Sequence, residues 1–198
     1  MKEALEPKNK PLAAVILAAG KGTRMNSDQP KVLSEVGGDP MIVHVIHTAK
    51  ALGAEKIITV LGYKYEMVQE ALKNESVEYA LQFQQLGTAH AVLQCHNILK
   101  SFEGNVLVLY GDAPLIQVST LSKLLNIHEK TNAWCTILTT DLPDPTGYGR
   151  IIRNQNLDLV KIVEEKDANT KERQIVEVNS GFYIFDSKIL FRLLPLVE

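Results

Sequence analysis

Short apolar runs alternate with segments of helical period along the first part of the chain. The runs cover residues 13–17, 56–61 and 106–110, and their short length and aliphatic or β-branched side chains are typical of buried strands. Helical periods lie between and after these runs, over residues 41–52, 65–72, 88–99 and 120–128. This alternation predicts a Rossmann-like α/β fold, in which helices cover both faces of a mostly parallel sheet and the crossovers are right-handed.

The pattern changes after Trp134, where shorter apolar segments follow one another. Two of them flank the polar turn Asn154-Gln155-Asn156, which predicts strands and a β-hairpin. Gly147 and Gly149 lie just before this hairpin. Glycines at such positions either let the backbone approach a substrate closely or shape a bulge or turn, and the residues alone leave both open.

Composition and charge narrow the class of protein. With 198 residues, of which 45% are apolar and 22% charged, we expect one globular domain over residues 12–198 and a flexible N-terminal extension over residues 1–11. The 21 basic and 23 acidic side chains give a net charge of −2, so no chain-wide field favours nucleic acid or a membrane as partner. Apolar runs are too short to span a bilayer, and the polar N-terminus has no signal-peptide core, so we expect a cytoplasmic protein.

A glycine-rich turn with two cations follows the first apolar run. Gly20 and Gly22 lack Cβ atoms, so their backbone can bring N–H groups close to anionic oxygens. Arg24 can engage phosphate oxygens through its planar fork, and Lys31 adds a mobile point charge. The segment 20–25 reads GKGTRM and fits neither the ATPase-type phosphate loop nor the dinucleotide fingerprint. It predicts another kind of nucleotide phosphate site, the alternative being an ordinary surface turn.

The cysteines and histidines give no metal or disulfide pattern. We expect Cys95 and Cys135 to be small core side chains, in a helix and a strand respectively. His44 and His47 lie three residues apart on a predicted helix, where geometry alone brings such pairs together, and no third ligand accompanies them.

Several motifs in fixed order resemble those of the sugar-1-phosphate nucleotidylyltransferases, in particular the uridylyltransferase domain of the bifunctional N-acetylglucosamine-1-phosphate uridylyltransferase/glucosamine-1-phosphate acetyltransferases. The motifs are LAAGKGTRMNSDQPKVL (17–33), LQFQQLGTAHA (81–91), LVLYGDAPLI (107–116), DPTGYGRI (144–151), IVEEKDA (162–168) and EVNSGFYIF (177–185). Together they extend over most of the chain, which makes the resemblance far more specific than a single motif.

The resemblance implies transfer of UMP from UTP to N-acetylglucosamine-1-phosphate, which yields UDP-N-acetylglucosamine and pyrophosphate for cell-envelope precursors. The implied cofactor is Mg²⁺, and the implied partners are these two small molecules, without nucleic acid or membrane. The attack would be in line, with no covalent enzyme intermediate. Two alternatives stay open: a nucleotidyltransferase for another sugar phosphate or nucleoside triphosphate, and a nucleotide-binding module without catalysis.

The same resemblance implies the residues of the site. The catalytic residues would be Arg24 and Lys31, and Asp112 would bind the metal. The nucleotide contacts would be Leu17, Ala18, Ala19, Gly20, Gly22, Lys31, Gln82, Gly87 and Thr88. The sugar contacts would be Tyr110, Gly111, Gly149, Glu164 and Asn179.

Chemistry supports several of these assignments without deciding them. Asp112 ends an apolar run at the expected ligand crevice and offers the hard oxygen that Mg²⁺ prefers. Gln82 carries an acceptor and a donor in one plane, as a pyrimidine edge requires. Thr88 would begin a helix whose N–H groups face the ligand. Glu165 stands beside Glu164, so either could be the sugar-binding glutamate.

The end of the chain bears on activity. The family supplies a second metal contact from a residue well after the EVNSG motif, and residues 187–198 read as a helix just begun. We therefore expect a truncated nucleotidyltransferase domain whose activity by itself is doubtful. Hexapeptide repeats, which would indicate the acetyltransferase domain of the bifunctional enzymes, are missing from the sequence.

Overall fold

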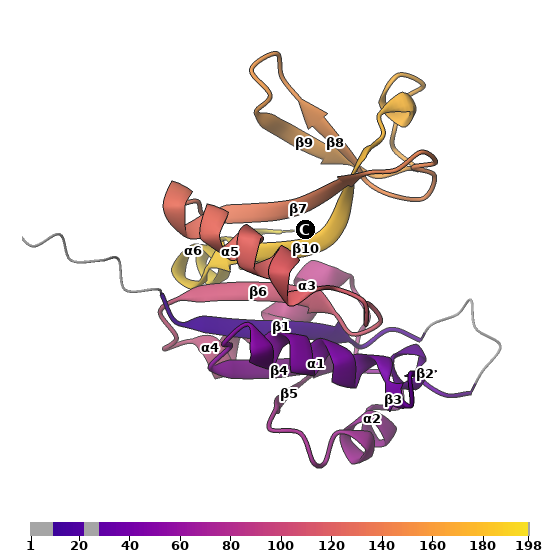
Figure 1. Cartoon of the computed structure of the whole chain (residues 1–198), viewed down its shortest axis with the longest axis vertical. Helices are drawn as coiled ribbons and strands as arrows, with labels where there is room; N and C mark the ends of the chain where they lie inside the picture. Colours follow the sequence, from indigo (N-terminus) through magenta and orange to yellow (C-terminus); the bar gives the residue numbers. More distant parts are fainter. Residues whose placement is uncertain (1–9, 22–27, 198) are drawn as a thin grey trace, which may run out of the picture. The chain divides into compact units, whose positions relative to one another are not determined.

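Four parallel strands form the centre of the structure (Figure 1), a computed structural model that describes residues 10–21 and 28–197. In spatial order they are β5 (Glu78–Leu81), β4 (Lys56–Leu61), β1 (Leu12–Ala18) and β6 (Asn105–Tyr110). The predicted parallel sheet is therefore confirmed. All seven side chains of β1 are buried, as expected for a strand with neighbours on both edges and helices on both faces.

Helices cover both faces of these parallel strands. The bounds are α1 (Met41–Ala51), α2 (Tyr65–Ala71), α3 (Thr88–Leu93), α4 (His96–Leu99), α5 (Val118–Thr131) and α6 (Ser187–Leu193), with 3₁₀ helices at η1 (Lys31–Leu33), η2 (Glu172–Gln174) and η3 (Leu194–Leu196). Figure 1 shows α1 and α5 in front of the strands, with α3 and α4 behind them. The arrangement confirms the predicted α/β class.

Most predicted helices match the observed ones, with one difference. Gly53 ends α1 with a φ of 91°, a left-handed conformation that favours glycine. The helix predicted over residues 88–99 is wrong as a single element, because it is divided into α3 and α4. At the division the Cys95 N–H donates to the Val92 carbonyl over 3.0 Å, a bond to the third preceding residue that tightens the turn and interrupts the α-helical ladder.

The chain divides into two compact units, of which the second comprises residues 137–183. It enters this second unit within β7 (Cys135–Asp141) and leaves it within β10 (Glu177–Asp186). Between them lies the predicted hairpin, formed by β8 (Arg150–Arg153) and β9 (Leu159–Val163) in antiparallel register.

Local hydrogen bonds close the hairpin turn. The Asn154 side-chain oxygen accepts from the backbone N–H groups of Asn156 and Asp158, each over 2.9 Å. Such bonds let an asparagine replace backbone partners in a turn. Strand β8 also pairs antiparallel with β10 at Arg150 and Val178. The sequence patterns did not predict β10, nor the two-residue strands β2 (Glu35–Val36) and β3 (Asp39–Pro40).

The two cysteines differ in their surroundings. Cys95 is buried, as predicted, and its burial raises the pKa of the thiol to about 12. The prediction that Cys135 is a core side chain is wrong, because this residue is exposed. It begins β7, a strand whose side chains are all exposed or only half-buried among the described residues.

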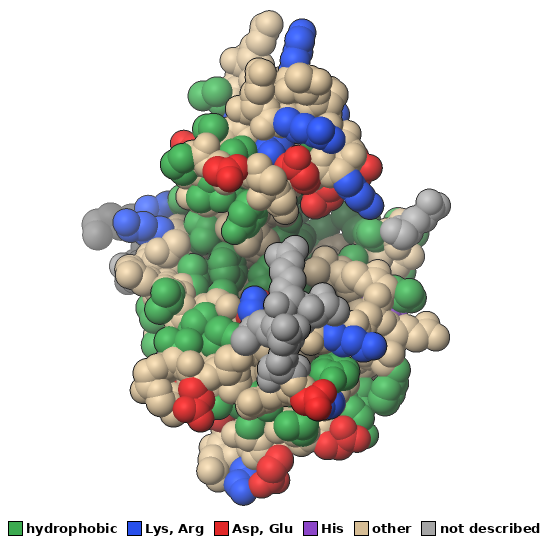
Figure 2. Space-filling model, turned by 90° about the vertical axis from the view of Figure 1, so that its right-hand side faces the viewer, with side chains coloured by type: hydrophobic (Ala, Val, Ile, Leu, Met, Phe, Trp, Pro, Cys, Tyr) green, Lys and Arg blue, Asp and Glu red, His purple; other side chains and the backbone are tan. Residues whose placement is uncertain are grey.

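The outer surface carries charges of both signs. Figure 2 shows acidic and basic side chains scattered over one face, without a continuous patch of either sign. This agrees with the small net charge of −2. Of the helices in the described part of the chain, none has the length and apolar character that crossing a bilayer would require.

Candidate active site

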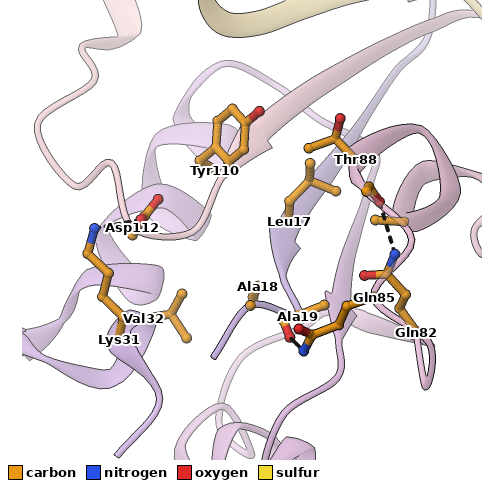
Figure 3. Close-up of a pocket in the computed structure, with 13 residues that line it drawn as sticks. Leu17, Ala18, Ala19, Lys31, Val32, Gln82, Gln85, Thr88, Tyr110 and Asp112 are labelled. Atoms are coloured by element: carbon orange, nitrogen blue, oxygen red, sulfur yellow. Dashed lines mark hydrogen bonds and ion pairs between the residues drawn. The ribbon is translucent and has the colours of Figure 1, made fainter. Parts of the chain in front are cut away.

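A pocket of about 290 Å³ opens at the carboxyl ends of the parallel strands β1, β5 and β6 (Figure 3). Its lining residues are Leu17, Ala18, Ala19, Gly20, Lys31, Val32, Gln82, Gln85, Gly87, Thr88, Ala91, Tyr110 and Asp112. Strand carboxyl ends are where open parallel sheets bind ligands. Most residues predicted for nucleotide and metal binding are thus brought together around one cavity in the first unit.

Two glycines allow the backbone segments around this pocket to approach one another. A Cβ on Gly62 would lie 2.8 Å from the Gln82 carbonyl oxygen and 2.9 Å from that of Ala19. A Cβ on Gly111 would lie 3.2 Å from Val32 Cγ1, and the Gly111 N–H donates to the Leu17 carbonyl over 2.9 Å. The strand ends can therefore pack closely only because these positions carry no side chain.

Lys31 and Asp112 face each other at one side of the pocket (Figure 3). Lys31 begins η1 and Asp112 follows β6, and the Lys31 Nζ lies 2.8 Å from the Asp112 Oδ2. Both side chains remain partly exposed, at 43% and 34%. The structure thus pairs the predicted catalytic cation with the predicted metal ligand across 81 positions of sequence.

Gln82 lies at the end of β5 and is almost completely buried, with 4% of its surface exposed. Its Nε2 donates to the Gly87 carbonyl over 3.0 Å and lies 2.9 Å from Nδ1 of His90. Gly87 has a φ of 104°, a left-handed conformation that favours glycine. This conformation lets the short loop between β5 and α3 return to Gln82. The predicted base-reading side chain is therefore held by its own loop.

Three lining residues were not predicted: Gln85, Val32 and Ala91. The Gln85 Nε2 donates to the Ala19 carbonyl over 2.7 Å, and this bond ties the loop after β5 to the end of β1 (Figure 3). Each of the three lies inside a motif on which the family resemblance rests, and these motifs were the sequence signal by which the residues could have been found. Their contribution to the pocket depends on tertiary contacts that the motifs do not reveal.

In the second unit, the predicted sugar residues Glu164 and Asn179 lie around the third, Gly149. The Asn179 N–H donates to the Gly149 carbonyl over 2.8 Å, which places β10 beside the glycine. A Cβ on Gly149 would lie 3.2 Å from Glu164 Oε1, so the glycine leaves room for that carboxylate. The Asn179 side chain accepts from the Gly181 N–H and donates to the Tyr183 hydroxyl. One of its two amide hydrogens is thereby left for a further acceptor.

The structure distinguishes the two neighbouring glutamates. The Glu165 Oε2 accepts from the guanidinium of Arg150 over 2.6 Å and from the Gly147 N–H over 3.3 Å. Arg150 is only 1% exposed, and its guanidinium lowers the pKa of Glu165. Glu165 is thus the charged partner of Arg150, and a buried cation needs such a partner. Glu164 is exposed, which favours it over Glu165 as a ligand contact.

Two predicted residues lie outside the described residues, namely Gly22 and Arg24. The remaining predicted nucleotide residues all line the pocket. Of the predicted sugar residues in the first unit, Tyr110 lines the pocket, and Gly111 does not line it but lies next to the lining residue Val32.

The histidine pair on α1 has separate partners. Nε2 of His44 lies 2.6 Å from the Val36 carbonyl oxygen, and Nε2 of His47 lies 3.2 Å from Glu75 Oε1. Among residues 10–21 and 28–197, no three histidine, cysteine or acidic side chains gather as a metal-binding group. The prediction that this pair is structural agrees with these contacts.

The fold is similar to solved structures of nucleotide-handling enzymes. A Bacillus anthracis protein assigned as a glucose-1-phosphate thymidylyltransferase, in complex with sucrose, superposes with a TM-score of 0.71 at 23% identity, covering 94% of this chain and 76% of that one. CMP:2-keto-3-deoxy-manno-octonic acid synthetase complexed with CTP superposes with a TM-score of 0.72 at 18% identity, covering 96% and 79%. At these identities the likeness establishes the fold.

Curated relatives are much closer in sequence. The Bifunctional protein GlmU of Bacillus mycoides (strain KBAB4) is 53% identical over 185 residues, which are 93% of this chain and 40% of the relative. The same protein of Bacillus thuringiensis (strain Al Hakam) matches to the same extent. The chain thus spans about two fifths of the length of these relatives. The sequence family described as Nucleotidyl transferase matches residues 13–197, and the chain belongs to that family.

Proposed function

We propose that this chain transfers UMP from UTP to N-acetylglucosamine-1-phosphate and forms UDP-N-acetylglucosamine and pyrophosphate, as a cytoplasmic step toward cell-envelope precursors. The observation that carries the proposal is the pocket at the strand ends, which gathers a cation, a carboxylate and a buried amide around one cavity. The 53% identity to the Bifunctional protein GlmU supports the choice of substrates.

The nucleotide end of the pocket is assigned to the ends of β1 and β5. Leu17, Ala18, Ala19 and Gly20 line the pocket and are assigned to the ribose and phosphates. Gln82 and Gly87 line it too and are assigned to the base. A buried side-chain amide and a neighbouring peptide group can match the hydrogen-bonding edge of a pyrimidine.

The phosphate end is assigned to Lys31 and Asp112, with Arg24 as a second cation. Lys31 uses one of its three N–H groups on Asp112, so two remain for phosphate oxygens. Asp112 lines the pocket, and a single carboxylate suits Mg²⁺, which takes its other ligands from water and phosphates. When bound there, Mg²⁺ would neutralise charge on the triphosphate.

Sugar contacts are assigned within each unit separately. In the second unit they are the residues of the cluster around Gly149, and in the first unit they are Tyr110, which ends β6, and Gly111, which follows it. The Glu164 carboxylate can accept from sugar hydroxyls, and the remaining Asn179 amide hydrogen can donate to a sugar oxygen. Because Gly149 has no side chain, the Glu164 carboxylate can lie beside its backbone.

The reaction needs no general base. The attacking phosphate oxygen of the sugar phosphate is already anionic at neutral pH, and the α-phosphorus of UTP accepts it as pyrophosphate leaves. Catalysis then depends on holding the two phosphates in line and on stabilising the negative charge that builds up between them. Lys31 is assigned this electrostatic role.

The test is Mg²⁺-dependent pyrophosphate release from UTP, CTP, GTP and dTTP with N-acetylglucosamine-1-phosphate, measured for this chain and for its full natural protein. Release confined to UTP is the expected result. Release with a different nucleotide, or only with another sugar phosphate, would reassign the substrates within the family. UTP binding without turnover in either form would identify a nucleotide-binding module in place of an enzyme.

A further inference from the structure

The hydrogen bonds around Gln82 determine which end of its amide can face a ligand. The Gly87 carbonyl can only accept, so the amide atom 3.0 Å away must be the nitrogen. That nitrogen has a second hydrogen, and His90 Nδ1 lies 2.9 Å from it. If Nδ1 accepts, both amide hydrogens are used inside the protein, and only the oxygen Oε1 is available to the pocket.

The neutral ring of His90 can accept one hydrogen bond, and two side-chain amides lie close enough to donate it, those of Gln82 and Gln94. Its other nitrogen, Nε2, lies 3.1 Å from Nε2 of Gln94, which also donates to the His90 carbonyl over 3.0 Å. A neutral imidazole carries one hydrogen, so only one of its nitrogens can accept. Gln82 is 4% exposed, whereas Gln94 is half-buried and can turn its amide over, so that its oxygen accepts from Nε2–H of His90 and its hydrogens reach water. An unsatisfied donor costs more when it is buried, so the lone pair belongs on Nδ1.

We propose that His90 is a positioning residue that accepts the second amide hydrogen of Gln82 through Nδ1, so that Gln82 presents a hydrogen-bond acceptor alone and the pocket prefers uracil to cytosine. The ring nitrogen N3 of uracil carries a hydrogen, whereas N3 of cytosine carries a lone pair. An acceptor fixed opposite that atom attracts the first base and repels the second. The proposal rests on the proposed function, because it assumes that the base lies against Gln82.

The binding test compares UTP with CTP in the presence of Mg²⁺, by isothermal titration calorimetry, for the wild type and three variants. In His90→Leu the second amide hydrogen has no partner, so the preference for UTP should fall by about fivefold to tenfold, as for the loss of one hydrogen bond. His90→Asn places an acceptor near the former Nδ1 and should restore most of the preference. Gln94→Met, the matched control, removes the contacts of Gln94 with the other ring nitrogen and with the His90 carbonyl, and should leave the preference unchanged.

A second measurement reads the bond directly, without any nucleotide. The ¹⁵N NMR signals of the His90 ring should show the hydrogen on Nε2 and a lone pair on Nδ1, in the wild type and in Gln94→Met. A hydrogen on Nδ1, or a His90→Leu variant that folds normally and keeps the wild-type preference, would overturn the proposal. If the wild type binds neither nucleotide, the proposed function fails and the selectivity with it, while the NMR signals still decide whether the bond exists.

Discussion

Lys31 and Asp112 form an ion pair in the structure, although Lys31 is assigned to phosphate oxygens and Asp112 to the metal ion. Their charged atoms are 2.8 Å apart, and both side chains are more than one third exposed. Ion pairs exposed to this extent contribute little to folding, typically less than about 1 kcal/mol. The pair therefore contributes little to the stability of the fold, which agrees with a role of both side chains in binding ligands.

Lys31→Ala should lower turnover on the order of 100-fold or more, because it removes the cation assigned to the charge that builds up during transfer. The free energy of unfolding should change by less than about 1 kcal/mol. Pyrophosphate release and urea denaturation measure the two effects. Lys73→Ala is the matched control, since Lys73 also forms an exposed ion pair, with Glu70 at 2.6 Å. A folded Lys31→Ala protein with full activity would remove Lys31 from the mechanism.

Asp112→Asn should raise the Mg²⁺ concentration needed for half-maximal activity, because a neutral amide oxygen binds a hard cation more weakly than a carboxylate does. A Mg²⁺ titration of pyrophosphate release measures the shift. Asp158→Asn, in the turn between β8 and β9, provides the comparison and should leave the titration unchanged. An unshifted titration in Asp112→Asn would mean that this carboxylate does not bind the metal.

The hairpin of β8 and β9 contains one buried cation, Arg150. Arg150 is 1% exposed and donates to Glu165, which the guanidinium keeps ionised by lowering its pKa from the ordinary value of 4.5. A carboxyl whose pKa is lowered in the folded state stabilises that state above its ordinary pKa, and the contribution is lost as the pH falls through the folded pKa.

Glu165→Gln should therefore destabilise the protein at pH 7 and flatten the loss of stability on acidification below about pH 4.5. Urea midpoints measured from about pH 7 down to pH 3 test this. Glu103→Gln is the control, because Glu103 pairs with Lys188 in an exposed position. Parallel pH profiles for the wild type and Glu165→Gln would show that the pair does not matter for folding.

Cys95 is buried inside the first unit, so the reactivity of its thiol can report the unfolding of that unit. The side chain is 0% exposed, and burial raises the pKa of its thiol to about 12. Since the thiolate is the reactive form, a native protein at neutral pH should resist alkylation at this position.

In a Cys135→Ser variant, the rate of Cys95 alkylation by iodoacetamide should rise with urea in parallel with global unfolding followed by circular dichroism. The fully unfolded protein is the positive control, because its thiol should react at an ordinary rate. Labelling that is fast in the absence of urea would mean that α3 and α4 open locally, without unfolding of the whole unit.

The local pattern of the sequence predicted much of the first unit. Strands β1, β4 and β6 and helix α1 lie within one or two residues of their predicted bounds, because apolar period and a terminal glycine act over a few neighbouring residues. The division of residues 88–99 into two helices and the exposure of Cys135 were predicted wrongly. Both features depend on which other parts of the chain pack against the segment. The hydrophobic period of the segment itself carries no information about those contacts.

The sequence by itself determined the α/β class and, through the ordered motifs, the family and the candidate site residues. Only the tertiary structure decided that Lys31 pairs with Asp112, that Glu165 and not Glu164 holds Arg150, and that His90 reaches Gln82. These contacts depend on where strands and loops meet in space, over separations of up to 81 residues. A motif specifies which side chains are present, but the packing of the strands decides which of their atoms touch.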